Sequence, residues 1–282
     1  MRIHHLNCGS MRPAGVKLIT RIDTAMPSPH MVCHCLLVET NDALVLVDTG
    51  FGLADIARPE ERLSKSMLKA MRPALLTHET AASQIESLGF STRDVKHIIL
   101  THLDPDHAGG LSDFPHARVH VLAEEHQGAT RRSSPKERLR YRPKQWDQST
   151  RWQLYSQRGE AWFGFEAVRD LSGLPPEFLM VPMSGHSRGH AAIALAHSEG
   201  WLLHCGDAYF EPGDVHHGLA CSSALTLFQR LIAHEHKHVL NNQRRLRELN
   251  ADTNNKVSLF CSHDASELAH HQRAHSPPHH QR

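Results

Sequence analysis

The chain has 282 residues, with 31 lysines and arginines against 30 aspartates and glutamates. This length is enough for the core of one large α/β domain or of two small ones. The near-zero net charge argues against electrostatic capture of nucleic acid or a membrane surface. No apolar run approaches the roughly 20 residues of a membrane span, and residues 1–8 lack a charged segment followed by an apolar one, so no signal peptide is predicted.

The six cysteines are too sparse for a disulfide scaffold, so reduced thiols and a cytoplasmic location are predicted. Cys33 and Cys35 flank His34 and resemble a ligand pair at first sight. They alternate, however, within the strand-like run 32–38. We therefore expect two buried strand cysteines on one face of a sheet.

Apolar runs bounded by turn residues predict the strands. Residues 36–40 and 43–47 are typical of a hairpin, 53–80 of mixed helix and loop, and 81–89 of a helix that ends at a glycine. The remaining predicted elements are strands at 95–100, 119–122, 178–181, 191–196, 201–205 and 257–261, and one helix at 222–250. This order, with strands in meanders and no strict βαβ alternation, favours an α/β fold with two sheets packed face to face and helices outside.

Two segments stand apart in composition. Residues 123–165 are rich in basic and aromatic side chains, which favours a lid or pocket wall over a purely structural insertion. Residues 266–282 are polar and rich in histidine, which predicts a disordered tail after a single domain at 1–265. The histidine pair His4 and His5 is expected to face solvent or to bond locally, because no partner residues stand at fixed offsets.

The most informative segment is residues 101–110, where four potential metal ligands fall close together. His102, Asp104, Asp106 and His107 directly follow the strand predicted at 95–100. Two imidazoles and two carboxylates in one short loop are the ligand types of a metal centre. Such a centre requires further ligands downstream.

Three later residues meet that requirement. His186 stands in the glycine-containing segment that follows the strand at 178–181, Asp207 follows the strand at 201–205, and His263 follows the strand at 257–261. Strand ends hold such side chains rigidly while one face stays open to a substrate. The loop of residues 101–110 and these three residues make four places where ligand-type side chains follow a strand. Together they predict a binuclear metal site.

This spaced set, with Asp48-Thr49-Gly50 upstream, resembles the metallo-β-lactamase superfamily over about residues 30–265. The resemblance implies a four-layer αβ/βα sandwich with the metals at one edge of the two sheets. The segments at 185–190 and 206–209 are most similar to the lactonase branch, which includes enzymes that open N-acyl homoserine lactones.

The resemblance also implies a ligand assignment. One divalent metal would be held by His102, Asp104 and His186, the other by Asp106, His107 and His263, with Asp207 bridging. Asp48 would orient ligands, and His190 would brace the loop that carries His186. Zinc is the expected metal, but the family usually has histidine where this chain has Asp104, and a harder carboxylate keeps iron or manganese open. The alternative is that Asp104 does not reach the metal.

The implied function is hydrolysis, in which a metal-bridging hydroxide attacks the carbonyl of a lactone, ester or related acyl substrate. Asp106 would steer the hydroxide and carry a proton to the leaving group, and Tyr209 would either donate to the oxyanion or be a packed aromatic.

The alternatives are thioester or phosphodiester hydrolysis, iron-dependent oxidation, or a non-catalytic member that binds a metabolite. The expected partner is a small-molecule substrate, with no nucleic acid and no membrane. The sequence does not indicate an oligomeric state.

Overall fold

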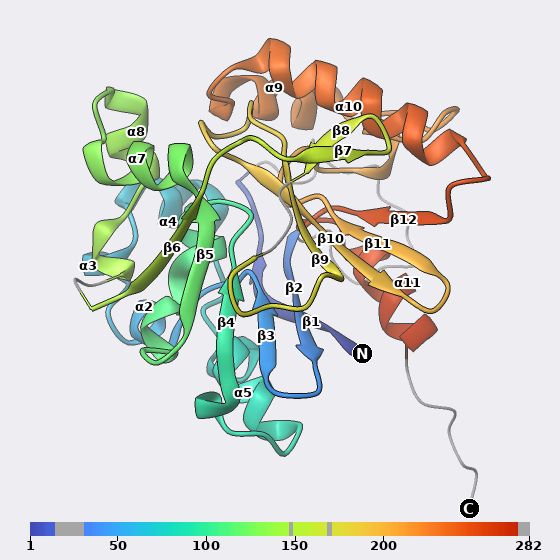
Figure 1. Cartoon of the computed structure of the whole chain (residues 1–282). Coiled ribbons are helices and arrows are strands. Elements are labelled where there is room, and N and C mark those ends of the chain that lie inside the picture. The colour runs from blue at the N-terminus through green and yellow to red at the C-terminus, as the bar shows by residue number, and fades with distance from the viewer. Residues whose placement is uncertain (15–30, 147–148, 168–170, 276–282) are drawn as a thin grey trace, which may run out of the picture.

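Two β-sheets face each other in the computed structural model, which describes residues 1–14, 31–146, 149–167 and 171–275 (Figure 1). The first sheet contains β1 (Arg2–Met11), β2 (Met31–Glu39), β3 (Leu44–Val47), β4 (Val95–Ile99), β5 (Arg118–Leu122) and β6 (Arg151–Tyr155) in that order. The second contains, in the order β12-β11-β10-β9, β9 (Phe178–Pro182), β10 (Ala191–His197), β11 (Gly200–His204) and β12 (Val257–Phe260). A small hairpin pairs β7 (Glu160–Trp162) with β8 (Phe165–Ala167).

Helices lie on the outer faces of both sheets (Figure 1). The helices are α2 (Leu53–Ala57), α3 (Pro59–Arg62), α4 (Lys65–Met71), α5 (Ala81–Ser87), α6 (Pro105–Ala108), α7 (Ala123–Arg131), α8 (Pro135–Arg140), α9 (Ser223–Ile232), α10 (His236–Ala251) and α11 (Ala265–His275). None of these described helices is long and apolar enough to cross a membrane.

The apolar strands are buried on both faces, which explains their continuous hydrophobic runs. On β2, Leu36 and Val38 pack between the sheets, whereas Leu37 packs toward the helices on the other side. Cys33 and Cys35 share that helix-facing side and are 1% exposed, so the prediction of buried strand cysteines is confirmed. The four layers of the predicted sandwich follow from this alternation.

The predicted meander is only partly right. β1, β2 and β3 are antiparallel neighbours, but β3, β4, β5 and β6 run parallel. Segments that contain helices connect β3 to β4, β4 to β5 and β5 to β6, as parallel pairing requires. The parallel strands send their carboxyl ends to the same edge of the sheet.

The helix predicted at 222–250 is two helices, α9 and α10, separated at residues 233–235. The backbone N–H groups of His234 and Glu235 donate to the carbonyls of His186 and Gly185, both at 2.8 Å. These two donors are therefore used to fix a distant loop instead of continuing the helix. No local sequence signal encodes this bond.

The prediction of a disordered tail is wrong for residues 266–275, which form most of α11, while residues 276–282 lie outside the described part of the chain. Leu268 is buried, and the Gln272 amide donates to the carbonyl of His5 at 3.0 Å. His5 itself is buried and bonds His34 Nε2 at 2.8 Å, so it neither faces solvent nor bonds locally.

The basic and aromatic segment at 123–165 is more regular than its composition suggests. It contains α7 and α8, and β6 extends the first sheet through parallel pairing with β5. Among its described residues, Lys136, Leu139 and Arg140 line a cavity of about 280 Å³ next to the predicted metal ligands. The segment therefore contributes one wall of that cavity and an edge of the sheet.

A buried histidine on β5 makes stability depend on pH. His120 bonds His97 Nδ1 at 2.9 Å and the Tyr155 hydroxyl at 2.8 Å, and burial lowers the pKa of His120 to about 3. The unfolded chain binds a proton at this residue near pH 6.5, whereas the folded chain does not. The contribution of neutral His120 to the free energy of unfolding is therefore complete above pH 6.5. It is lost as the pH falls from 6.5 toward 3.

We expect His120→Gln to reduce the pH dependence of the free energy of unfolding between pH 7.5 and 5, by at most about 1.4 kcal/mol per pH unit. Urea unfolding followed by tryptophan fluorescence measures this slope. His116→Gln is the matched control, because His116 is exposed. An equal slope for His120→Gln and the wild type would contradict the prediction.

Candidate metal centre

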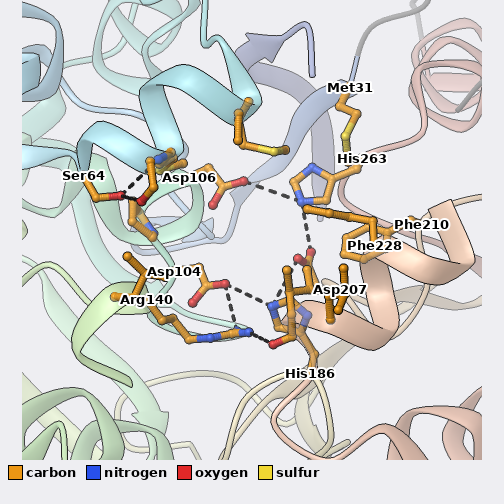
Figure 2. A pocket seen from close by; sticks show the side chains of 18 of the residues that line it. Met31, Ser64, Asp104, Asp106, Arg140, His186, Asp207, Phe210, Phe228 and His263 are labelled. Carbon is orange, nitrogen blue, oxygen red and sulfur yellow. Dashed lines mark hydrogen bonds and ion pairs between the residues drawn. The ribbon is translucent and has the colours of Figure 1, made fainter. Parts of the chain in front are cut away.

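Seven predicted ligands converge where strands of the two sheets end, as Figure 2 shows for five of them. His102 follows β4, Asp207 follows β11 and His263 follows β12, so each side chain projects from the loop just past a strand. The short helix α6 begins after Asp104 and carries Asp106 and His107. The strand ends therefore deliver ligands from both sheets to one place.

The carboxylate of Asp207 lies at the centre of the group. Its Oδ1 is 3.3 Å from His107 Nε2 and 3.2 Å from His263 Nε2. Its Oδ2 is 3.8 Å from His102 Nε2 and 3.5 Å from His186 Nε2. The two oxygens thus face two different pairs of imidazoles.

The two remaining carboxylates complete the two groups. Asp104 Oδ2 is 3.0 Å from His186 Nε2 and 3.5 Å from His102 Nε2. On the other side, Asp106 Oδ2 is 3.6 Å from His263 Nε2 and 3.9 Å from His107 Nε2. The structure therefore brings together the two predicted ligand sets on either side of Asp207.

The outer nitrogens of three imidazoles are held by neighbours, so their Nε2 atoms face inward. His107 Nδ1 bonds Asp48 Oδ2 at 2.9 Å, His263 Nδ1 donates to the Val32 carbonyl at 2.7 Å, and His102 Nδ1 bonds the Thr101 hydroxyl at 3.0 Å. Partners of this kind fix the ring orientation of metal-binding histidines.

Several inward atoms of this buried cluster have no hydrogen-bond partner within the described residues. They are His102 Nε2, His107 Nε2, Asp104 Oδ1 and Asp207 Oδ1. Buried polar atoms are normally satisfied, and an unsatisfied one costs about 1–3 kcal/mol. Imidazole nitrogens and carboxylate oxygens that converge in this way suit a divalent cation such as zinc. The residues present therefore fit the metal that the sequence predicts.

The charges in the cluster are strongly coupled. Burial alone would raise the pKa of Asp207, but His263, His107 and the other imidazoles outweigh it and hold this pKa well below its usual range. Burial would lower the pKa of His107, but Asp207, Asp106 and Asp48 raise it well above its usual range. Metal binding would displace the proton that these carboxylates favour on His107, because ligands bind metals in their deprotonated form.

Asp48 and His190 support the ligand loops from behind. Asp48 accepts hydrogen bonds from the Thr101 N–H at 2.8 Å and the Thr101 hydroxyl at 2.7 Å. His190 Nε2 accepts from the Asp207 N–H at 3.0 Å, and its Nδ1 donates to the Met183 carbonyl at 3.2 Å. Since both ring nitrogens of His190 are engaged, the residue braces the loops.

A residue that sequence reasoning missed connects the two ligand loops. Glu125 is fully buried and accepts from the Leu103 N–H at 3.0 Å, the Ser187 hydroxyl at 2.7 Å and the Gly189 N–H at 2.9 Å. Its carboxylate thus ties the loop of residues 101–110 to the loop of His186. A glutamate in the first turn of a helix is usually exposed, so nothing in the sequence distinguished this one.

Two more residues approach the ligands without having been predicted to do so. Arg140 Nη1 donates to Asp104 Oδ2 at 2.9 Å. The Cys33 thiol and the ligand atoms of Asp106 and His263 lie within 4.8 Å of one another. Cys33 is therefore both a buried strand residue and a neighbour of the cluster.

Tyr209 does not reach the cluster. It is fully buried in the core of the second sheet, and its hydroxyl donates to Glu267 Oε1 at 2.9 Å. The following residue, Phe210, lines the cavity instead. This position agrees with the packed-aromatic alternative for Tyr209 and not with a donor to an oxyanion.

A cavity of about 280 Å³ opens beside the ligands, and its residues surround Asp106 and Asp207 in Figure 2. Its walls are mainly apolar. They include Met31, Met67, Met71, Leu139, Phe210, Phe228, Leu231 and Ile232. A small molecule with an apolar portion fits such a cavity, since ligand sites combine apolar walls with few polar groups.

The family model described as "Metallo-beta-lactamase superfamily" matches residues 29–263. The chain belongs to this superfamily, and the predicted class of metal-dependent hydrolase is confirmed. Probable metallo-hydrolases of Mycobacterium tuberculosis and Mycobacterium bovis are each 41% identical over 265 residues, which is 94% of this chain and 80% of theirs.

Lactonases are among its more distant relatives. An N-acyl homoserine lactonase of Bacillus cereus is 28% identical over 97 residues, which is 34% of this chain and 38% of that protein. The structure of an N-acyl homoserine lactone hydrolase with bound N-hexanoyl-L-homoserine aligns with a TM-score of 0.69 at 18% identity, covering 95% of both chains. A dizinc quorum-quenching lactonase aligns with a TM-score of 0.60 at 17% identity, covering 93% of this chain and 86% of the other. These alignments confirm the predicted fold.

We expect the wild-type protein to bind close to two divalent metals per chain, and Asp207→Ala to bind fewer than one. The carboxylate of Asp207 faces both imidazole pairs, so its loss should weaken both positions. Metal analysis after dialysis measures the stoichiometry. Asp42→Ala, in an exposed turn, is the control. Unchanged metal content in Asp207→Ala would contradict the central place of this carboxylate.

We expect Glu125→Ala to lower the free energy of unfolding by about 2–5 kcal/mol, because three donors lose a buried acceptor. Urea unfolding of the metal-free protein measures the loss. Glu86→Ala, on the exposed face of α5, should change stability by less than about 0.5 kcal/mol. Equal effects of the two substitutions would show that Glu125 does not connect the loops energetically.

Proposed function

We propose that the chain hydrolyses a lactone, ester or related acyl compound with two divalent metal ions, zinc being the expected metal. The observation that carries this proposal is the Asp207 carboxylate, whose two oxygens face separate imidazole pairs beside a mainly apolar cavity. His102, Asp104 and His186 would hold one ion, Asp106, His107 and His263 the other, and Asp207 would bridge. Two such ions, when bound, supply water of lowered pKa and polarise a carbonyl oxygen.

Residues of the chain would transfer the proton and hold the substrate. Asp106 lines the cavity and keeps 8% of its surface exposed, so its carboxylate is accessible to a bound substrate. In the proposed reaction it accepts a proton from the attacking water and passes it to the leaving oxygen. Phe210, Phe228 and Met31 would exclude bulk water and pack against the acyl portion of the substrate.

The comparisons support an acyl substrate without naming it. Two structures of similar fold are those of lactonases with bound N-hexanoyl homoserine products, which combine an acyl chain with a polar head. The lining of the cavity here combines both kinds of group, because apolar side chains such as Phe210 and Phe228 line it together with the carboxylates of Asp104, Asp106 and Asp207. Thioester and phosphodiester hydrolysis and iron-dependent oxidation are the competing reactions on the same ligand set.

A panel of one lactone, one ester, one thioester and one phosphodiester tests the proposal with the metal-loaded protein. We expect turnover of the lactone or the ester with the highest kcat/KM. Turnover of the phosphodiester alone would contradict the acyl assignment. No turnover of any panel member, with metal bound, would favour a non-catalytic member that binds a metabolite.

We expect Asp106→Asn to lower kcat by about 10²–10⁴-fold, which is the usual contribution of a positioned acid or base. Steady-state kinetics at saturating metal measures the loss, and metal analysis of the same sample separates it from loss of a ligand. Asp42→Asn, in the exposed turn, should retain wild-type kcat. A kcat within threefold of the wild type in Asp106→Asn would contradict the proposed role.

A further inference from the structure

Arg140 is a cation placed beside the proposed metal ligands. It is the last residue of α8, and it lines the cavity with Asp104 and His186 (Figure 2). Its Nη1 donates to Asp104 Oδ2 at 2.9 Å, and its Nη2 donates to the carbonyl of Ile232, the last residue of α9. The side chain of Arg140 is 9% exposed, so this ion pair is largely removed from solvent.

A buried arginine beside a cation site is unfavourable unless something compensates for it. Its positive charge repels a divalent metal at short range, and its own desolvation is costly. Asp104 provides the compensation, because its carboxylate adds one negative charge to a cluster that already contains Asp106 and Asp207. Burial alone would raise the pKa of Asp104, but Arg140 and the neighbouring imidazoles hold it well below its usual range.

We propose that Asp104 and Arg140 act as one charge-neutral ligand unit, in which Arg140 is a positioning residue that offsets the charge of Asp104 at the metal site. The carboxylate oxygen that Arg140 binds is also the one nearest to His102 and His186. Arg140 therefore acts through Asp104 and sets how strongly this side of the cluster attracts a divalent cation. The inference rests on the proposed metal centre.

Opposite effects of two substitutions follow from this proposal. Arg140→Gln removes the cation but keeps a donor for the Ile232 carbonyl, so Zn²⁺ and Mn²⁺ should bind roughly tenfold more tightly. Asp104→His supplies a competent neutral ligand but leaves Arg140 uncompensated, so binding should weaken by roughly tenfold. The double substitution should return to within about threefold of the wild type, and Arg140→Lys, which retains the charge, should stay near it.

Competition with a chromophoric chelator, on full-length protein stripped of metal, measures these affinities without an activity assay. The matched control is Arg138→Gln, because Arg138 is on the same helix, exposed, and bonded only to the carbonyls of Arg132 and Ser133 among the described residues. We expect this control to leave the affinities within about twofold of the wild type.

Unchanged or weaker binding in Arg140→Gln would overturn the proposal, as would unchanged or tighter binding in Asp104→His. If Arg140→Gln fails to fold by circular dichroism, Asp104→His alone decides. A wild-type protein that binds no divalent metal would instead overturn the metal centre itself, so the two failures are distinguishable.

Discussion

The Asp207 carboxylate, buried between two pairs of imidazoles, is the interaction on which the rest of the site depends. A carboxylate removed from water is tolerated only where positive or hydrogen-bonding groups surround it. Here each oxygen faces a different pair of histidines. Those histidines must in turn be held in place, and the buried contacts of Asp48, His190 and Glu125 serve that purpose. The polar interior is therefore organised outward from one residue, with each shell of partners fixing the one inside it.

The same constraint explains why the site lies where the two sheets meet. His102 comes from the first sheet, whereas Asp207 and His263 come from the second. Neither sheet alone could surround Asp207, so the geometry depends on the apolar layer between them, which includes Val47, Phe178 and other buried side chains. The core thus positions the ligands as well as stabilising the chain. The break between α9 and α10 has the same function, since the N–H groups of His234 and Glu235 donate to the loop of His186.

The convergence of the predicted ligands could be foreseen because each of them follows a strand whose apolar run is visible in the sequence, and strand ends meet at one edge. Glu125 and Arg140 were not, because each acts across a long separation in sequence from a helix whose local pattern is ordinary. Tyr209 was misleading for a related reason. Proximity to Asp207 in sequence does not fix direction, and the chain places Phe210 toward the cavity and Tyr209 into the core. The helix α11 was missed because its composition is polar, while its burial comes from contacts with distant residues such as His5.

Asp104 shows why ligand chemistry cannot be assigned one residue at a time. Taken alone, a third carboxylate in the cluster would make the site more negative and favour harder metals. In the folded chain it has a buried guanidinium at 2.9 Å, from the segment 123–165 that the sequence suggested was a lid or pocket wall. The charge that a metal meets is the sum over both groups, and the two were brought together by tertiary structure alone. On the proposal for Arg140, the preference of this site for zinc, iron or manganese depends on α8 as much as on the loop of residues 101–110.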